Sequence, residues 1–98
     1  MTRTEALTAL ERYAEPVKEI GATALYLYGS TARDEAGVTS DLDLFIDYDS
    51  RGRFNALDLV GIKIFLEESL HLPIDLTTRD SLHPRLRDDI VHSAIRIF

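Results

Sequence analysis

Residues 42–48 constrain the fold more than any other segment, because their side chains alternate with a period of two. The two faces carry different residues: Leu42, Leu44 and Ile46 on one, and Asp43, Phe45 and Asp47 on the other. Alternation of this kind is typical of a strand with one buried face. The pattern therefore predicts a strand whose apolar side enters the core and whose aspartates are held at the rim of a sheet.

The flanking segments predict the element order αβαβαβα, with a short edge strand at residues 95–98. Helices are expected at residues 5–20, 31–35, 54–70 and 84–93, and strands at 23–28, 42–48 and 72–77. Pro16 predicts a kink or an early end of the first helix, and Gly21 its end. The predicted fold class is α/β (α+β), a small mixed sheet with helices packed on it, in a single domain at residues 1–98.

Two further expectations concern residues inside these segments. The apolar positions of the helix expected at 54–70 predict one wide packed face: Phe54, Leu57, Ile64, Phe65 and Leu70. Residues 37–40 are expected to form a turn, and Pro73 to stand at the start of its strand.

Charge and composition exclude several kinds of function. The net charge of −6 argues against non-specific binding to a nucleic-acid backbone. A chain so acidic can handle a polyanion such as ATP only with a cation between them, and a divalent metal is the natural one. The absence of cysteine excludes disulfides and thiolate–zinc sites. With no apolar run long enough for a signal peptide or a membrane span, we expect a soluble, cytoplasmic protein without a membrane partner.

Three features of the sequence are candidates for phosphate or metal binding. Gly29-Ser30 ends a predicted strand, where backbone N–H groups and a hydroxyl can approach a phosphate, although a plain turn is the commoner reason for such a pair. Asp41 and Asp43 share one strand face about 6.5 Å apart, a spacing suited to Mg²⁺ or to a solvated acidic face. Asp75 lies among apolar residues, which indicates a metal ligand, an ion pair with an arginine such as Arg79, or an exposed position on an edge strand.

Together these features resemble a known superfamily. Residues 29–44 are similar to the G-S-x-A-R-G…S-D-x-D-L signature of DNA polymerase β nucleotidyltransferases, and most similar to their minimal branch, the MNT proteins. Residues 82–92 resemble the C-terminal helix of small bacterial members, so the likeness covers most of the chain. Asp34 departs from the signature, because it stands where the family often has glycine, which tolerates positive φ better.

The resemblance implies a polymerase β-like nucleotidyltransferase fold and Mg²⁺-dependent transfer of AMP from ATP to a hydroxyl group. It implies two metal ions, with Mn²⁺ an acceptable substitute for Mg²⁺. The implied site residues form two groups: Asp41, Asp43 and Asp75 as catalytic and metal-binding residues, and Gly29, Ser30, Arg33 and Ser40 as nucleotide-binding residues. A solvated helix arginine is the alternative interpretation of Arg33.

The same resemblance implies a partner. Small MNT proteins are commonly paired with a HEPN ribonuclease toxin, which the MNT antitoxin adenylylates. Two alternatives stay open: a non-catalytic antitoxin that masks its partner, and a nucleotidyltransferase for a small molecule. Loss of neutralisation on changing Asp41 and Asp43, with the complex retained, would distinguish catalysis from masking.

Overall fold

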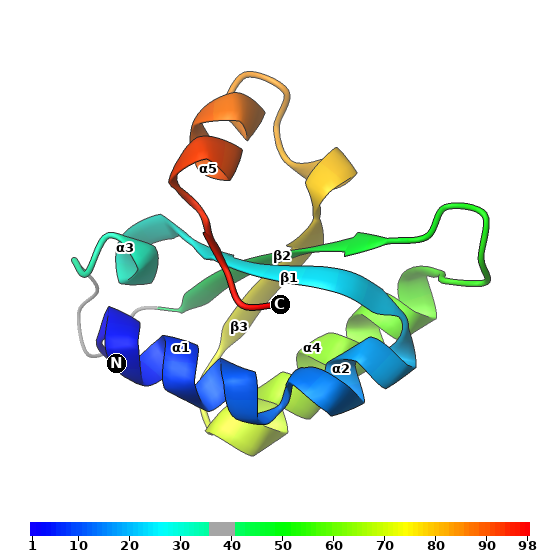
Figure 1. Ribbon diagram of the computed structural model, residues 1–98, viewed down its shortest axis with the longest axis horizontal. Coiled ribbons are helices and arrows are strands. Elements are labelled where there is room, and N and C mark those ends of the chain that lie inside the picture. The colour runs from blue at the N-terminus through cyan, green and yellow to red at the C-terminus, as the bar shows by residue number, and fades with distance from the viewer. Residues whose placement is uncertain (36–40) are drawn as a thin grey trace.

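The computed structural model describes residues 1–35 and 41–98. At its centre is a four-stranded sheet in the order β3-β2-β1-β4 (Figure 1). The strands are β1 (Ala22–Tyr28), β2 (Leu42–Tyr48), β3 (Ile74–Thr78) and β4 (Ile95–Arg96). β1 runs antiparallel to β2 and β4, whereas β2 and β3 are parallel. This mixed sheet confirms the predicted fold class, and β4 confirms the expected edge strand.

Helices cover one face of the sheet and leave the other largely open (Figure 1). The covering helices are α1 (Arg3–Arg12), α2 (Ala14–Ile20) and α4 (Ala56–Leu70). The shorter elements are α3 (Gly29–Ala32), the 3₁₀ turn η1 (Arg79–Ser81) and α5 (Arg87–Ser93). Within the described residues, no helix has both the length and the apolar composition that crossing a membrane requires.

The apolar face of β2 packs into the core as predicted. Leu42, Leu44 and Ile46 are buried, and they form one cluster with residues of α1, α2 and α4. Asp43 and Asp47, which alternate with them, are only half-buried and lie on the opposite face of the sheet. The alternation thus separates the core from the face that carries the aspartates.

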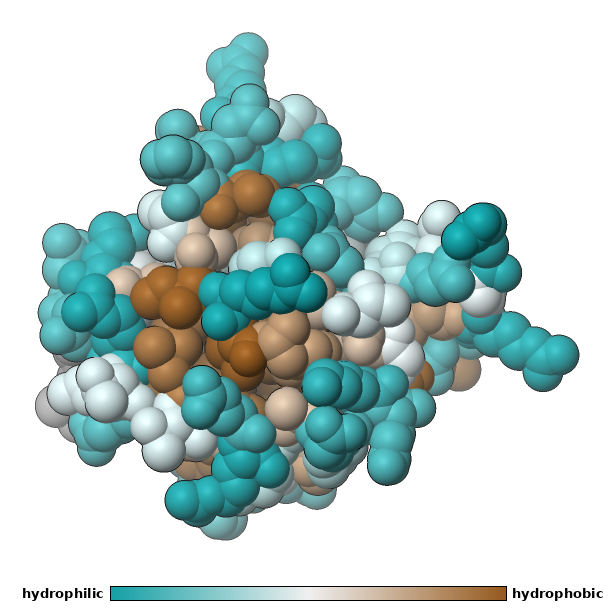
Figure 2. All heavy atoms as spheres, viewed as in Figure 1, coloured by the Kyte–Doolittle hydropathy of each residue, from teal (hydrophilic) through white to brown (hydrophobic). Residues whose placement is uncertain are grey.

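The C-terminal segment continues the pairing of β4 with β1. The N–H of Ile97 donates to the carbonyl of Leu25 (2.8 Å), and the N–H of Leu25 donates to the carbonyl of Phe98 (3.2 Å). Ile95, Ile97 and Phe98 are partly buried against the core. Figure 2 shows apolar side chains gathered over this part of the molecule within a hydrophilic surround.

The first predicted helix is in fact two helices. α1 and α2 meet at Tyr13, and Pro16 lies in the first turn of α2. The first turn is where a missing N–H costs no hydrogen bond, so Pro16 marks a new helix rather than a kink at its own position. Gly21 ends α2 with φ of 138°, as predicted.

The helix predicted at residues 54–70 begins later and packs on a different face. Asn55 caps α4 by accepting hydrogen bonds from the N–H groups of Leu57 (2.9 Å) and Asp58 (3.2 Å). Ile62 and Leu66 are the fully buried residues, whereas Leu57 is 80% exposed and Ile64 48% exposed. The prediction of Leu57 and Ile64 on the packed face was therefore wrong. A helix that is apolar on several sides does not reveal from its sequence which side meets the sheet.

Other boundaries differ by a few residues. The last helix begins at Arg87 rather than Pro84, because residues 83–86 form a turn in which the N–H of Leu86 donates to the carbonyl of His83. α3 ends at Ala32, earlier than expected. The turn predicted at residues 37–40 lies outside the described residues.

Candidate active site

The parallel pairing of β2 and β3 brings two predicted site residues side by side. Asp43 and Asp75 are direct register partners, on strands that lie about 4.8 Å apart in such a ladder. Both alternate with core residues, so their carboxylates project from the open face of the sheet. β3 is an edge strand, and Asp75 is exposed there.

Tyr28 flanks Asp43 on the other side. It is the register partner of Asp43 in the antiparallel pair of β1 and β2. Burial raises the pKa of the Tyr28 hydroxyl, and the negative charges of Asp43 and Asp75 raise that pKa further. Tyr28 is not among the site residues predicted from the sequence. The one sequence feature that could have indicated Tyr28 as a site residue is its position directly before Gly29, at the end of a predicted strand.

Gly29 allows the backbone to lie against the Asp43 carboxylate. It has φ of 75°, a conformation that side chains rarely adopt. A Cβ at this position would overlap a carboxylate oxygen of Asp43 and lie 3.0 Å from its Cγ. β1 therefore turns into α3 at the position where only glycine leaves room for the aspartate.

Two of the other predicted nucleotide-binding residues, Ser30 and Arg33, lie within or directly after α3. Ser30 is half-buried in α3, which is anchored by the buried residues Thr31 and Ala32. Arg33 is exposed, and its Nε lies 3.1 Å from a carboxylate oxygen of Glu35. The Arg33 charge opposes the rise in the pKa of Asp43, so it acts on the site. Ser40 lies outside the described residues.

Asp41 directly precedes β2 and is exposed. Its charge contributes to the raised pKa of Asp43, after burial and the charge of Asp75. Within residues 1–35 and 41–98, no three acidic, histidine or cysteine side chains are grouped so that they could hold a metal ion by themselves. Mg²⁺ usually takes one or two carboxylates and completes its shell with substrate phosphates. The donor set of Asp43 and Asp75 fits a divalent cation shared with a nucleotide.

Metal affinity should fall at mildly acidic pH. Burial raises the pKa of Asp43, and the charges of Asp75 and Asp41 raise it further, so protonation competes with a cation at a higher pH than for an ordinary aspartate. Below that raised pKa, we expect the affinity for Mn²⁺ to fall by up to about tenfold per pH unit. Calorimetric titration from pH 7.5 down to about pH 4, near the ordinary aspartate pKa, measures this. Equal affinity across that range would contradict a site at Asp43.

Arg79 does not pair with Asp75. Its Nε and Nη2 donate to the two carboxylate oxygens of Asp47, at 2.8 and 3.0 Å. The same guanidinium lies over the rings of Tyr26 and Phe45, which are themselves stacked 4.7 Å apart. Of the alternatives for Asp75, the ion pair with Arg79 is therefore excluded, and the exposed edge position is what the structure has.

Asp34 has the positive φ that the glycine common in the family at this position indicated. Its φ is 60°, and its Oδ1 accepts a hydrogen bond from Arg3 N–H (3.1 Å). We expect Asp34→Ala to cost about 1 kcal/mol, because alanine loses that bond and tolerates this φ poorly. Asp34→Gly should stay within about 0.5 kcal/mol of the wild type, because relief of strain offsets the lost bond. Urea denaturation compares the two, and an alanine variant as stable as the glycine variant would contradict this account.

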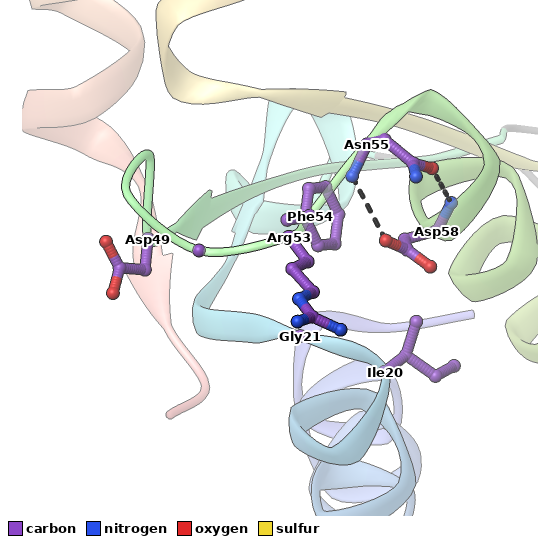
Figure 3. A pocket seen from close by; sticks show the side chains of 8 residues that line it. Ile20, Gly21, Asp49, Arg53, Phe54, Asn55 and Asp58 are labelled. Carbon is purple, nitrogen blue, oxygen red and sulfur yellow. Dashed lines mark hydrogen bonds between the residues drawn. The ribbon is translucent and has the colours of Figure 1, made fainter.

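A surface hollow lies at the other end of the sheet. It has a volume of about 510 Å³ and lies between the end of α2 and the start of α4. Figure 3 shows its lining, with Asn55 and Asp58 joined in the α4 cap and Arg53 extending toward Gly21. This region begins at Asp49, six residues along from Asp43, which is about 20 Å in a strand. Asp43 and Asp75 do not line this hollow. They lie on an open face of the sheet, so a bound nucleotide would itself supply part of the site.

Comparison with known proteins agrees with this geometry. Residues 10–97 match the family described as "Nucleotidyltransferase domain". The "Putative protein adenylyltransferase MJ0435" of Methanocaldococcus jannaschii is 39% identical over 71 residues, which cover 72% of this chain and 74% of that protein.

Two solved structures share the fold. A "putative minimal nucleotidyltransferase" superposes with a TM-score of 0.83 at 33% identity, over 97% of this chain and 95% of that one. A chain of the complex between the tri-AMPylated Shewanella oneidensis HEPN toxin and its MNT antitoxin superposes with a TM-score of 0.66. That likeness covers 94% of this chain and 71% of the other at 15% identity, so it concerns the fold alone.

The mixed sheet, the strand-to-helix turn at Gly29 and the family match together define the class of protein. The chain belongs to the nucleotidyltransferase domain family, and within it to the minimal nucleotidyltransferase type. It is thus a nucleotidyltransferase, as the signature at residues 29–44 predicted.

Proposed function

We propose that this nucleotidyltransferase moves AMP from ATP to a hydroxyl group of a partner protein. The observation that carries the proposal is the register pairing of Asp43 with Asp75, next to a glycine turn whose backbone lies against the Asp43 carboxylate. Its relative MJ0435 is named as a protein adenylyltransferase, which favours a protein acceptor over a small molecule. ATP as donor also favours the cytoplasm as the place of action.

Each residue has a proposed role in that transfer. Asp41 and Asp43 would hold Mg²⁺ when ATP binds, and Gly29 with Ser30 binds the β- and γ-phosphates through N–H and hydroxyl donors. Arg33 and Ser40 add contacts to the nucleotide. Asp75 would complete the metal ligands, and it takes the proton of the acceptor hydroxyl. Bound Mg²⁺, or Mn²⁺ in its place, would neutralise charge that develops on the phosphates.

The reaction is an in-line displacement. The acceptor oxygen forms a bond to the α-phosphorus of ATP, the bond from that phosphorus to the bridging oxygen breaks, and pyrophosphate leaves with the electron pair. The acceptor proton passes to Asp75 and then to water. Because Asp75 stands exposed at the sheet edge, a bulky protein acceptor can reach it from solvent.

We propose a HEPN-type toxin as the partner, so that the protein acts as an antitoxin in a single domain. The solved complex of an AMPylated HEPN toxin with an MNT antitoxin, which shares this fold, supports that kind of partner. A masking antitoxin without catalysis is the second candidate, because the described surface has exposed apolar residues on α4 that suit protein contacts.

Co-expression with the partner separates the two candidates. Wild-type protein and an Asp41→Asn/Asp43→Asn variant are each expressed with the toxin, and growth and complex formation are both measured. Catalysis predicts that the variant still binds the toxin in a pull-down but no longer restores growth. Full neutralisation by the variant would instead establish masking.

A further inference from the structure

Tyr28, Asp43 and Asp75 form one row across the open face of the sheet. Tyr28 and Asp75 are the register partners of Asp43 on its two sides, and all three side chains alternate with core residues. Neighbouring strands lie about 4.8 Å apart, so the backbones of Tyr28 and Asp75 are about 10 Å apart, with Asp43 midway between them. The site therefore has two different sides, one at β1 and one at β3.

The two sides of this row suit different parts of a nucleotidyl transfer. On the β3 side, Asp75 is exposed at the sheet edge, where an acceptor can approach. On the β1 side, Tyr28 directly precedes Gly29 and Ser30, the residues proposed to bind the β- and γ-phosphates. An in-line displacement places the attacking and leaving oxygens on opposite sides of the α-phosphorus. An acceptor at Asp75 therefore directs the leaving pyrophosphate toward β1 and Tyr28.

The hydroxyl of Tyr28 forms no hydrogen bond with any group in residues 1–35 and 41–98. The Tyr28 ring packs against Phe45, with ring centroids 5.8 Å apart, and this contact uses the ring alone. By contrast, the hydroxyl of Tyr48 donates to the Asp80 carboxylate (2.9 Å). A tyrosine hydroxyl that is removed from water usually has a hydrogen-bond partner. The half-buried hydroxyl of Tyr28 is therefore available to a ligand bound on this face.

The Tyr28 hydroxyl acts as a neutral hydrogen-bond donor. An ordinary tyrosine hydroxyl already keeps its proton at neutral pH. Burial and the negative charges of Asp43 and Asp75 raise the pKa of Tyr28 further, so the proton stays in place. An O–H group donates about twice as strongly to an anionic oxygen as to a neutral one. A protonated hydroxyl beside the phosphates can thus stabilise the charge that pyrophosphate gains as it leaves.

We propose that Tyr28 is a substrate-binding residue whose hydroxyl donates a hydrogen bond to the β-phosphate of the bound nucleoside triphosphate and to the pyrophosphate that leaves. The inference rests on the proposed function for the location of the phosphates. It gives the row a direction: the acceptor enters at Asp75, the α-phosphorus reacts near Asp43, and pyrophosphate leaves past Tyr28. Because the transferred AMP keeps only the α-phosphate, Tyr28 contacts the part of the nucleotide that is released.

Calorimetric titration with two probes tests this contact. Pyrophosphate and AMP are each titrated, with Mg²⁺, into the wild-type protein and into Tyr28→Phe, which keeps the ring and removes the hydroxyl. The affinity for pyrophosphate should fall about tenfold, since a hydrogen bond to a charged group is lost. The affinity for AMP should not change, because AMP has no β-phosphate. Absence of pyrophosphate binding to the wild-type protein, equal pyrophosphate affinities of the two proteins, or an equal loss for AMP would each overturn the proposal.

Tyr26→Phe is the matched control. Tyr26 lies on the same face of β1, two residues before Tyr28, and belongs to the next row, where it stacks on Phe45 beneath the guanidinium of Arg79. Its loss of a hydroxyl should leave the affinity for pyrophosphate unchanged, and an equal loss of affinity in both variants would overturn the proposal. Tyr28→Phe should also melt within about 3 °C of the wild type, because ring packing is kept. A clear loss of stability with pyrophosphate affinity retained would show that the hydroxyl serves the fold, which would overturn the proposal.

Transfer assays separate failure of this inference from failure of the proposed function. If the wild-type protein transfers AMP to its partner, Tyr28→Phe should raise the KM for ATP and weaken inhibition by pyrophosphate, each about tenfold. Transfer with unchanged inhibition by pyrophosphate would overturn the Tyr28 contact and leave the proposed function standing. Pyrophosphate binding that depends on Tyr28, without transfer to the partner, would contradict the proposed function and support the contact.

Discussion

Asp43→Asn should abolish nucleotidyl transfer and, in the same protein, stabilise the metal-free fold. The loss of transfer should exceed about 100-fold, since the carboxylate would no longer bind a cation worth several kcal/mol to the transition state. The gain in stability follows from the position of Asp43, which is half-buried and beside the charge of Asp75. Asparagine keeps the shape of the side chain and removes the charge.

The sign of this change in stability follows from the pKa of Asp43, which burial and the charges of Asp75 and Asp41 raise above 3.8. A carboxyl with a raised pKa in the fold opposes folding at neutral pH. That penalty disappears as pH falls through the raised pKa toward the ordinary one. The advantage of Asp43→Asn should be largest near pH 7, on the order of 0.5 kcal/mol after solvent screening, and vanish near pH 4.

Thermal unfolding without divalent metal, at several pH values, measures this advantage. Asp47→Asn is the matched control, two residues further along the same face. It breaks the ion pair with Arg79, so it should cost about 1 kcal/mol while transfer persists. A destabilised Asp43→Asn variant would contradict the unfavourable burial of the Asp43 charge beside Asp75.

Gly29→Ala should be the second severe change. The added Cβ would overlap the Asp43 carboxylate and would have to adopt a φ of 75°. We expect a loss of about 1–2 kcal/mol in stability from the backbone alone. Transfer should fall more than about tenfold, because the aspartate must move from its place between Tyr28 and Asp75.

Gly61→Ala is the control for this variant, because the same atom is added at an open position. It should keep full transfer activity. Chemical denaturation and a transfer assay on both variants provide the comparison. Normal activity in Gly29→Ala would show that the close approach of Gly29 to Asp43 is not needed.

The strand at residues 42–48 could be predicted because Leu42, Leu44 and Ile46 recur with a period of two, and the fold class followed from its neighbours. The pairing of Asp43 with Asp75 could not, because register is a property of two strands. A slip of one residue would turn Asp75 toward the core face. The position of Tyr28 depends in the same way on the register of β1 with β2.

The helices show a different limit of prediction from the sequence. The break at Tyr13 was missed because the apolar spacing of residues 5–20 continues across it, and only capping and packing decide where α2 begins. For α4, its apolar residues on several sides fit more than one packed face. The side with Ile62 and Leu66 meets the core, and the side with Leu57 and Ile64 is left exposed.

The most direct test of the central claim is the intact mass of the partner toxin after incubation with this protein, ATP and Mg²⁺. If the paired aspartates support protein adenylylation, the partner should gain the mass of one or more AMP units, and the Asp41→Asn/Asp43→Asn variant should leave it unchanged. An unchanged partner mass with the wild-type protein, in a complex that still forms, would contradict catalysis and leave a masking protein on a nucleotidyltransferase fold.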